Sequence, residues 1–388
     1  GRRMRIAQVA PLYESVPPLF YGGTERVVSY LTEELIRQGH DVTLFASGDS
    51  VTAARLAPQC PRSLRQDHEC IDQLAHHILM LERVIRQSDN FDIIHFHIDY
   101  LHFPWSRRRG ITHLTTLHGR LDIPDLVPLY REFDEMPVVS ISNAQRIPLP
   151  WLNWQGTIYH GLPRDLYTFQ DHPEGYLAFL GRISPEKGVD RAIEIARHAG
   201  LKFRMAAKVD RVDREYFRDV IQPLLDPGFV EYVGEIGERE KNRFLGGALA
   251  LVLPVDWPEP FGMVMIEAMA CGTPVIAFGR GSIPEVLRDG VTGFIVENVA
   301  GAVDAVARVA SLNRRLCREE FEQRFDVARM AREYVDVYAR LILEKTARAA
   351  VAGASAHPFS EYRSHREKHP VSPGEALPLR SALPRQRL

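Results

Sequence analysis

Two segments in the second half of the chain place charged side chains beside glycines and prolines. The first is Gly181-Arg182-Ile183-Ser184-Pro185-Glu186-Lys187-Gly188, which follows an apolar run. Ser184 is predicted to cap the helix that follows, with Pro185 in its first turn. The free N–H groups of such a helix start would form a diphosphate site with Arg182 and Lys187. A capped surface helix with exposed basic side chains explains the pattern equally well, because helix starts of this kind are common.

The second segment is Trp257–Thr273 (WPEPFGMVMIEAMACGT), in which one glutamate interrupts an apolar helix. A carboxylate at Glu267 is costly to bury unless a hydroxyl pair, a backbone N–H or an arginine satisfies it. Glu259 lies before the helix, where two flanking prolines stiffen its loop. The amides at the helix start can reach hydroxyl or phosphate oxygens, and they belong to Gly262, Met263 and Val264.

The segments lie in a chain whose apolar pattern predicts two parallel α/β units. In the first unit the predicted strands are Met4–Ala10, Asp41–Ser47, Phe91–His97, Leu114–His118 and Pro137–Ser142. The pattern restarts after residues 162–175, with predicted strands Tyr176–Ile183, Leu201–Lys208, Val230–Gly234, Ala250–Val255, Pro274–Phe278 and Gly293–Val296. Helical patterns separate the strands, which indicates two doubly wound domains with a ligand site in the cleft between them.

Composition narrows the possible partners. The 388 residues carry a formal net charge of −2, so a general affinity for nucleic acid or anionic lipid is not expected. The four cysteines have no C-x-x-C spacing and are interpreted as reduced thiols. No apolar run is long enough to span a bilayer, so a cytoplasmic protein with at most peripheral membrane contact is expected.

The combined motifs resemble a known family. G-R-x-x-P-E-K-G together with E-P-F-G-M-V-x-x-E-A-M-A-x-G-x-P-V-I-A is similar to the family-4 group of retaining glycosyltransferases, which have the two-Rossmann-domain (GT-B) fold. The resemblance extends over most of residues 4–345, including Gly22-Gly23, Thr116–Gly119 and Gly281–Glu285. It implies an N-terminal acceptor domain (1–165), a nucleotide-sugar domain (166–325), a helix returning to the first domain (326–345) and a tail (346–388). The tail is rich in Pro, Arg and Ser and is expected to be mostly disordered.

The resemblance also implies roles for particular residues. Arg182 and Lys187 would neutralise the donor diphosphate, Glu259 would bind the transferred sugar, and Glu267 would hold the ribose. The backbone amides of Phe261–Val264 would assist Glu259, and His118 would contact the transferred sugar. Gly22 and Gly23 would let the backbone approach the diphosphate closely. One departure from the family is Met205–Asp210, where many relatives have a glycine-rich turn, and Lys208 there is a candidate phosphate or base contact.

The expected reaction is transfer of a hexose from a nucleotide diphosphate with retention of configuration. UDP- or GDP-hexose is expected as donor, with UDP-glucose preferred, and the acceptor is left open as a small molecule, a glycan or a lipid-linked group. No D-x-D pair is present in either domain, so no metal or other cofactor is expected. Glu259 is assigned to positioning and electrostatics, since a glycosidase-type nucleophile is not required.

Functions other than glycosyl transfer could also explain some of these sequence features. His95 and His97 lie on one face of a strand end, so a metal-dependent hydrolase is an alternative, although no H-E-x-x-H accompanies them. A nucleotide-sugar epimerase shares the architecture, and a degenerate binding module is the non-enzyme alternative. A dehydrogenase is disfavoured because the first strand is not followed by G-x-G-x-x-G.

Aromatic and basic residues of the first half suggest acceptor contacts. Four aromatic side chains are candidates for stacking on a sugar, and core packing explains them equally well; they are Tyr100, Trp105, Trp151 and Trp154. Arg107-Arg108-Arg109 is a candidate contact for lipid headgroups or a solvated loop.

Overall fold

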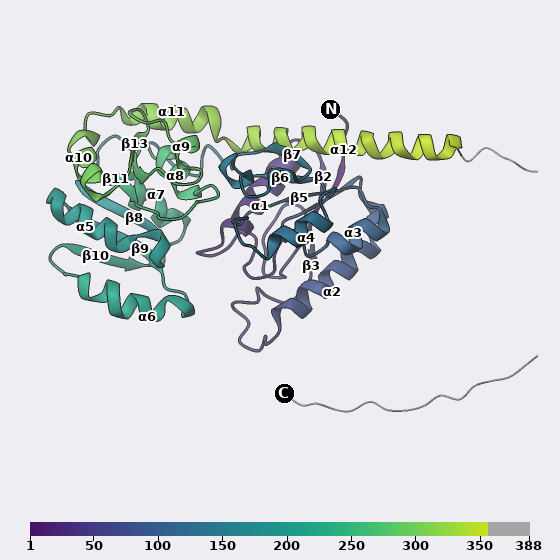
Figure 1. The fold of residues 1–388 in the computed structure, drawn as a ribbon, viewed down its shortest axis with the longest axis horizontal. Helices are drawn as coiled ribbons and strands as arrows, with labels where there is room; N and C mark the ends of the chain where they lie inside the picture. The colour runs from purple at the N-terminus through teal and green to yellow at the C-terminus, as the bar shows by residue number, and fades with distance from the viewer. Residues whose placement is uncertain (356–388) are drawn as a thin grey trace, which may run out of the picture. The chain divides into compact units, whose positions relative to one another are not determined.

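The structure is a computed structural model that describes residues 1–355. Two all-parallel sheets account for its strands, as the alternating pattern predicts (Figure 1). The end of the expected tail, residues 356–388, lies outside the described residues. Residues 346–355 correct the expected start of the tail, because they continue the last helix in a stretch rich in alanine, the residue with the highest helix propensity.

The first sheet has seven strands in the order β3-β2-β1-β4-β5-β6-β7. Its strands are β1 (Arg5–Val9), β2 (Asp41–Ala46), β3 (Arg55–Pro58), β4 (Ile93–Phe96), β5 (His113–Thr116), β6 (Val138–Ser140) and β7 (Trp154–Thr157). Its helices are α1 (Gly23–Arg37), α2 (Gln73–Arg86), α3 (Phe103–Arg109) and α4 (Leu126–Glu132). Neither β3 nor β7 was predicted from the sequence, because these strands are short, outermost and only partly buried and so lack an apolar pattern.

The second sheet has six strands in the order β10-β9-β8-β11-β12-β13. Its strands are β8 (Tyr176–Arg182), β9 (Lys202–Lys208), β10 (Val230–Gly234), β11 (Ala248–Leu253), β12 (Val275–Phe278) and β13 (Gly293–Val296). Its helices are α5 (Val189–Ala199), α6 (Arg214–Tyr216), α7 (Glu238–Gly246), α8 (Met263–Ala270), α9 (Ile283–Val286), α10 (Val299–Val309) and α11 (Arg314–Arg324). Alternation along β8 separates two cores: Phe179 packs with the α5 and α10 side, and Ala178 with the α7 and α8 side.

The last helix, α12 (Val327–Ser355), follows the second sheet, and its part up to Lys345 packs on the first (Figure 1). Tyr334 hydrogen-bonds to Thr116 of β5, and Tyr338 hydrogen-bonds to Gln8 of β1. This confirms the expected return of a C-terminal helix to the first half of the chain.

One local prediction is wrong. Ser184 makes no capping bond with its side chain, and α5 begins only at Val189. Residues Pro185–Lys187 instead form a 3-10 turn closed by Lys187 N–H to the Ser184 carbonyl, 3.1 Å. Gly188 then takes a left-handed conformation (φ 74°), where an added Cβ would lie 2.3 Å from the Pro254 carbonyl oxygen. The turn therefore separates Lys187 from the helix that the sequence analysis joined to it.

Candidate functional site

The carboxyl ends of both sheets border two adjoining cavities. The first cavity has a volume of about 230 Å³ and is lined by both halves of the chain. Of the residues expected from the sequence, it contains Gly22, Gly23, Lys187, Glu259, Gly262, Met263, Val264 and Glu267. The second cavity, of about 400 Å³, contains His118 and Arg182 and shares Tyr21, Gly22, Gly23 and Lys208 with the first. The structure thus brings most of the expected residues together, in two neighbouring spaces.

Lys187 and Glu259 join the two charged segments. Lys187 Nζ lies 2.7 Å from Glu259 Oε2, which also accepts a hydrogen bond of 2.8 Å from Trp257 Nε1. The ammonium group lies 4.9 Å from the centre of the Trp257 ring. Glu259 Oε1 has no hydrogen-bond partner among the described residues, so it is available to a ligand in the first cavity.

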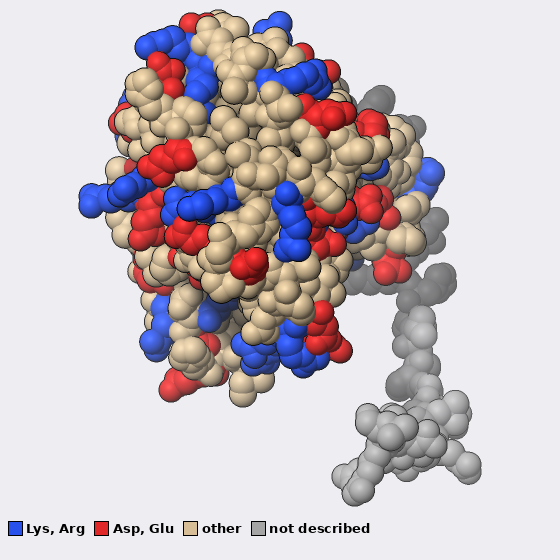
Figure 2. Space-filling view, turned by 90° about the vertical axis from the view of Figure 1, so that its left-hand side faces the viewer, with Lys and Arg blue, Asp and Glu red and all other residues tan. Residues whose placement is uncertain are grey.

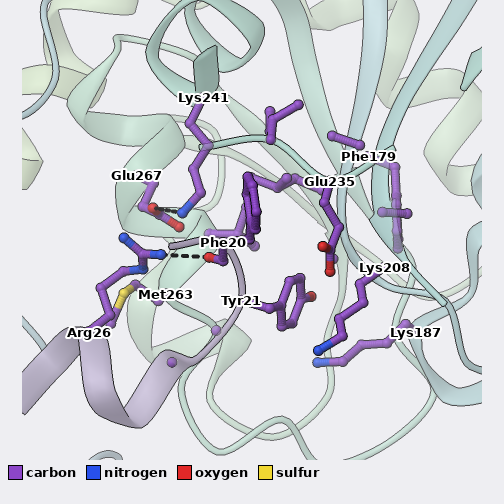
Figure 3. Close-up of a pocket in the computed structure, with 18 of the residues that line it drawn as sticks. Phe20, Tyr21, Arg26, Phe179, Lys187, Lys208, Glu235, Lys241, Met263 and Glu267 are labelled. Atoms are coloured by element: carbon purple, nitrogen blue, oxygen red, sulfur yellow. Dashed lines mark hydrogen bonds and ion pairs between the residues drawn. The ribbon is translucent and has the colours of Figure 1, made fainter. Parts of the chain in front are cut away.

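Glu267 is buried and held by two side chains. Tyr167 donates a hydrogen bond of 2.5 Å to Oε2. Lys241 forms an ion pair of 2.8 Å with the same oxygen (Figure 3). The other oxygen, Oε1, has no partner within residues 1–355. A buried carboxylate with one free oxygen can accept a hydrogen bond from a hydroxyl group of a ligand.

Three side chains of the first cavity were not anticipated from the sequence. Tyr21 comes from the loop before α1 and lies between the two halves (Figure 3). Arg26 of α1 forms an ion pair with Glu238 of α7, and Lys241 pairs with the same carboxylate at 3.1 Å. The sequence offers a weak signal for Arg26 and Lys241, since charged helix residues are usually solvated and only the fold shows that these two are buried.

Two helix starts face the first cavity. The 15-residue helix α1 begins at Gly23, with Gly22 as its N-cap, and α8 begins at Met263 after Gly262. Gly22 has a φ of 142°, a backbone conformation that residues with a side chain rarely adopt, so glycine is favoured there. Unpaired N–H groups at helix starts favour anions.

The second cavity holds the remaining expected residues. Arg182 ends β8, directly opposite Lys208 of β9 in the sheet register. Its guanidinium pairs with Glu186 at 3.1 Å and lies within 4 Å of Asp210 and Asp213. Arg182 and Lys187 thus have different carboxylate partners. Lys208 lines both cavities, and its ammonium group lies 5.7 Å from the Tyr21 ring centre.

Asp99, just after β4, also lines the second cavity. It is the one non-glycine residue among residues 1–355 with a positive φ, 55°. Its carboxylate has no hydrogen bond or ion pair with the described residues, and surrounding protein raises its pKa. Backbone strain of this kind clusters at functional sites.

Burial shifts the ionisation of other groups in the second cavity. Burial raises the pKa of the Glu25 carboxyl to about 7 and lowers the pKa of His118 to about 4. His118 is therefore neutral at pH 7 and can accept a hydrogen bond at one ring nitrogen.

Several candidates lie outside the cavities. Phe261 is buried, with its ring 4.6 Å from that of His160, and anchors the loop that carries Glu259. All three tryptophans are partly buried. Trp151 and Trp154 pack against the core beside β6, and Trp105 packs against the core beside α2. Tyr100 is partly exposed beside Tyr130. Arg107 pairs with Glu132 and Glu135 at the surface. These contacts favour the packing interpretation for the tryptophans.

His95 and His97, the candidates for a metal site, are fully engaged in hydrogen bonds. His95 contacts Tyr338 and Thr116, and His97 contacts Gln8 and His118. No three His, Cys, Asp or Glu side chains within residues 1–355 are grouped so as to hold a metal ion.

The surface and the helices bear on possible partners. The face in Figure 2 intersperses Lys and Arg with Asp and Glu, in line with the small net charge. Among the described helices, none is both long and apolar enough to cross a membrane. All four cysteines are free thiols.

Two all-parallel α/β halves that meet at a ligand-sized cleft define the GT-B class of glycosyltransferase folds. The model of the family "Glycosyl transferases group 1" matches residues 168–325, and that of "Glycosyltransferase Family 4" matches residues 21–155. The chain belongs to the family-4, group 1 glycosyltransferases.

Individual relatives share this architecture at low identity. N-acetyl-alpha-D-glucosaminyl L-malate synthase of Bacillus anthracis is 24% identical over 82% of this chain and 93% of its own length. AviGT4, a glycosyltransferase involved in avilamycin A biosynthesis, has a crystal structure that matches with a TM-score of 0.68 and 25% identity, covering 88% of this chain and 98% of that one. HepE of Anabaena, solved with UDP-glucose, has a TM-score of 0.67 at 17% identity, covers 87% of this chain and 100% of that one, and so shares the fold alone.

Proposed function

We propose that this protein transfers a hexose from a nucleotide diphosphate to an acceptor hydroxyl with retention of configuration. A UDP- or GDP-hexose is the donor, and UDP-glucose is preferred. The supporting observation is the Lys187–Glu259 pair, which lies in one cavity with Glu267 and the start of α1. That cavity offers a cation and free N–H groups for a diphosphate and two free carboxylate oxygens for hydroxyls.

In this proposal the donor extends along the first cavity. Glu267 Oε1 accepts a hydrogen bond from the ribose, and Lys187 with Lys208 neutralises the diphosphate. The N–H groups at the start of α1 add to that neutralisation. Glu259 Oε1 binds a hydroxyl of the hexose beside the reacting carbon.

The transfer step needs no covalent enzyme intermediate. The bond between the anomeric carbon and the diphosphate oxygen breaks, and charge builds on the leaving oxygens, where Lys187 and Arg182 stabilise it. The acceptor oxygen bonds to the same face of the anomeric carbon, and its proton passes to the leaving diphosphate. The proposed transfer step uses no metal ion.

The hexose end of the donor reaches His118 at the border of the second cavity, and the acceptor binds farther along that cavity, where Asp99 offers hydrogen-bond acceptors. Its identity is left open among a small molecule, a glycan and a lipid-linked group. We also propose a cytoplasmic location, which the four free thiols favour.

The experiment is a panel of nucleotide sugars incubated with the full chain, with and without mixed acceptors. Products are followed by NMR for nucleotide release and anomeric configuration. UDP or GDP release with an α-linked hexose from an α-linked donor is expected. Inverted product would contradict retention. An isomerised nucleotide sugar formed without acceptor would identify an epimerase. Hydrolysis that occurs only with added zinc would favour a metal-dependent hydrolase.

A further inference from the structure

A chain of buried polar side chains leads from His118 into the first half of the molecule and ends on α12. Its members are Gln8 of β1, His95 of β4, His97 just after β4, Thr116 of β5, and Tyr334 and Tyr338 of α12. Each of them is at most 3% exposed. Strands of a parallel sheet covered on both faces are normally apolar, so this row of polar residues departs from the pattern.

The first part of this hydrogen-bond network runs from His118 to α12. His118 Nε2 lies 3.0 Å from His97 Nδ1, and His97 Nε2 lies 2.7 Å from Gln8 Oε1. The Gln8 amide then donates to the Tyr338 hydroxyl at 3.0 Å. Three contacts thus connect the helix α12 to a histidine that lines the second cavity.

The far end of the chain is satisfied as well. The Tyr338 hydroxyl lies 2.5 Å from His95 Nδ1, and His95 Nε2 lies 2.7 Å from Thr116 Oγ1. Thr116 Oγ1 in turn lies 2.9 Å from the Tyr334 hydroxyl. Because buried polar groups are costly when unpaired, a complete network of this kind constrains the position and the protonation of every member.

The direction of the contacts fixes where each ring carries its proton. The Gln8 carbonyl oxygen can only accept, so His97 must donate from Nε2. Burial holds the pKa of His97 well below its ordinary value, so the ring is neutral and its Nδ1 is an acceptor. His118 must therefore donate from Nε2, and its Nδ1 carries no proton.

The hydrogen-bond network ends at His118 Nδ1. It has no partner among the described residues, and His118 lines the second cavity. A neutral ring with an unprotonated Nδ1 can accept a hydrogen bond from a ligand hydroxyl and cannot donate one.

We propose that Gln8, His97 and Tyr338 are positioning residues that hold His118 with its proton on Nε2, so that Nδ1 accepts a hydrogen bond from a hydroxyl of the transferred hexose. This role for the hexose rests on the proposed function, whereas the placement of the proton does not. This network of hydrogen bonds makes His118 selective for a sugar that carries a hydroxyl group at the position facing Nδ1. A fluorine or a hydrogen there could not donate a hydrogen bond.

The first test reads the proton directly. Two-dimensional ¹H–¹⁵N NMR of the full chain, with His118 assigned through His118→Gln, distinguishes the two neutral forms of the ring. A proton on Nε2 in the wild type, and loss of that single form in Gln8→Met, are expected. A proton on Nδ1 in the wild type would overturn the proposal whatever the activity of the protein.

The second test separates positioning from folding. Tyr338→Phe removes the hydroxyl that fixes Gln8, and Tyr334→Phe, one turn earlier on α12, is its matched control. Tyr338→Phe should lower kcat about five- to tenfold with the donor KM changed less than about twofold, and Tyr334→Phe should have a smaller effect. In a His118→Ala background, Tyr338→Phe should have no further effect on kcat, since its action passes through His118.

The same variants are assayed with deoxy and fluoro analogues of the donor hexose. Wild-type protein should discriminate against the analogue altered at one ring position, and His118→Ala should lose that discrimination. Equal losses from Tyr338→Phe with and without His118, or discrimination that survives His118→Ala, would overturn the proposal. UDP-induced thermal stabilisation that persists in the variants would show that the donor site itself is intact.

Discussion

Lys187 Nζ lies 2.7 Å from Glu259 Oε2, and this contact joins two segments that are 72 residues apart in the chain. The pair neutralises both groups in the absence of a ligand. A diphosphate would share the ammonium group, since an ammonium has three donors and only one is used here. Glu259 keeps its second partner, Trp257, and would stay in place.

Removing the cation should weaken catalysis more than folding. Lys187→Ala is expected to lower kcat/KM for the donor by about 100-fold, because a preorganised charge at the leaving oxygens is lost. The melting temperature should change little, since Trp257 still holds Glu259. Lys202, an exposed lysine of β9, provides the control in Lys202→Ala. Equal activity of the two variants would contradict the role of Lys187.

Glu267 is expected to act on the nucleotide and not on the sugar. Glu267→Gln keeps the shape but replaces a charged acceptor, so UDP should bind about tenfold more weakly. Inorganic diphosphate, tested by competition, should bind with nearly unchanged affinity because it has no ribose. Glu319→Gln changes an exposed glutamate of α11 and serves as the control. A parallel loss for diphosphate would place Glu267 elsewhere in the donor site.

Lys241 compensates the buried carboxylate of Glu267 and the partly buried carboxylate of Glu238. Lys241→Met should therefore cost about 3 kcal/mol of folding free energy, because breaking a buried ion pair leaves a charge without a partner. The loss is measured by urea unfolding of the full chain. Adding Glu267→Gln to Lys241→Met should recover part of it. A double variant less stable than Lys241→Met would show that Glu267 does not depend on Lys241.

Glu25 should make stability depend on pH. Burial raises the pKa of its carboxyl from the ordinary value of 4.5 to about 7. The folded chain thus holds this proton more tightly than the unfolded chain. The contribution is fully present below pH 4.5 and is lost as the pH rises through 7.

Glu25→Gln, which stays neutral, should accordingly gain melting temperature relative to wild type between pH 5 and pH 8. Thermal melts at the two pH values measure the difference. A gain that is the same at both would show that Glu25 titrates normally.

The fold and the two charged segments that line the first cavity could be predicted from the sequence, because both depend on local patterns. Apolar runs separated by helical periods were sufficient for the inner strands, and Glu267 stood out as a charge within an apolar helix. Arg26 and Lys241 could not be recognised, because their burial depends on contacts between α1, α7 and α8. The hydrogen bond between His97 and Gln8 could not be predicted either, since the two residues are 89 positions apart in the sequence.

Direct binding of UDP-glucose to the full chain tests the central claim, measured by isothermal titration calorimetry without added metal. Saturable binding to the wild type and to Lys202→Ala is expected, with a loss of at least about tenfold in Lys187→Ala and in Glu267→Gln. Binding of equal strength in all four proteins, or no binding of UDP-glucose, UDP or GDP to the wild type, would contradict a nucleotide-sugar site between the two halves.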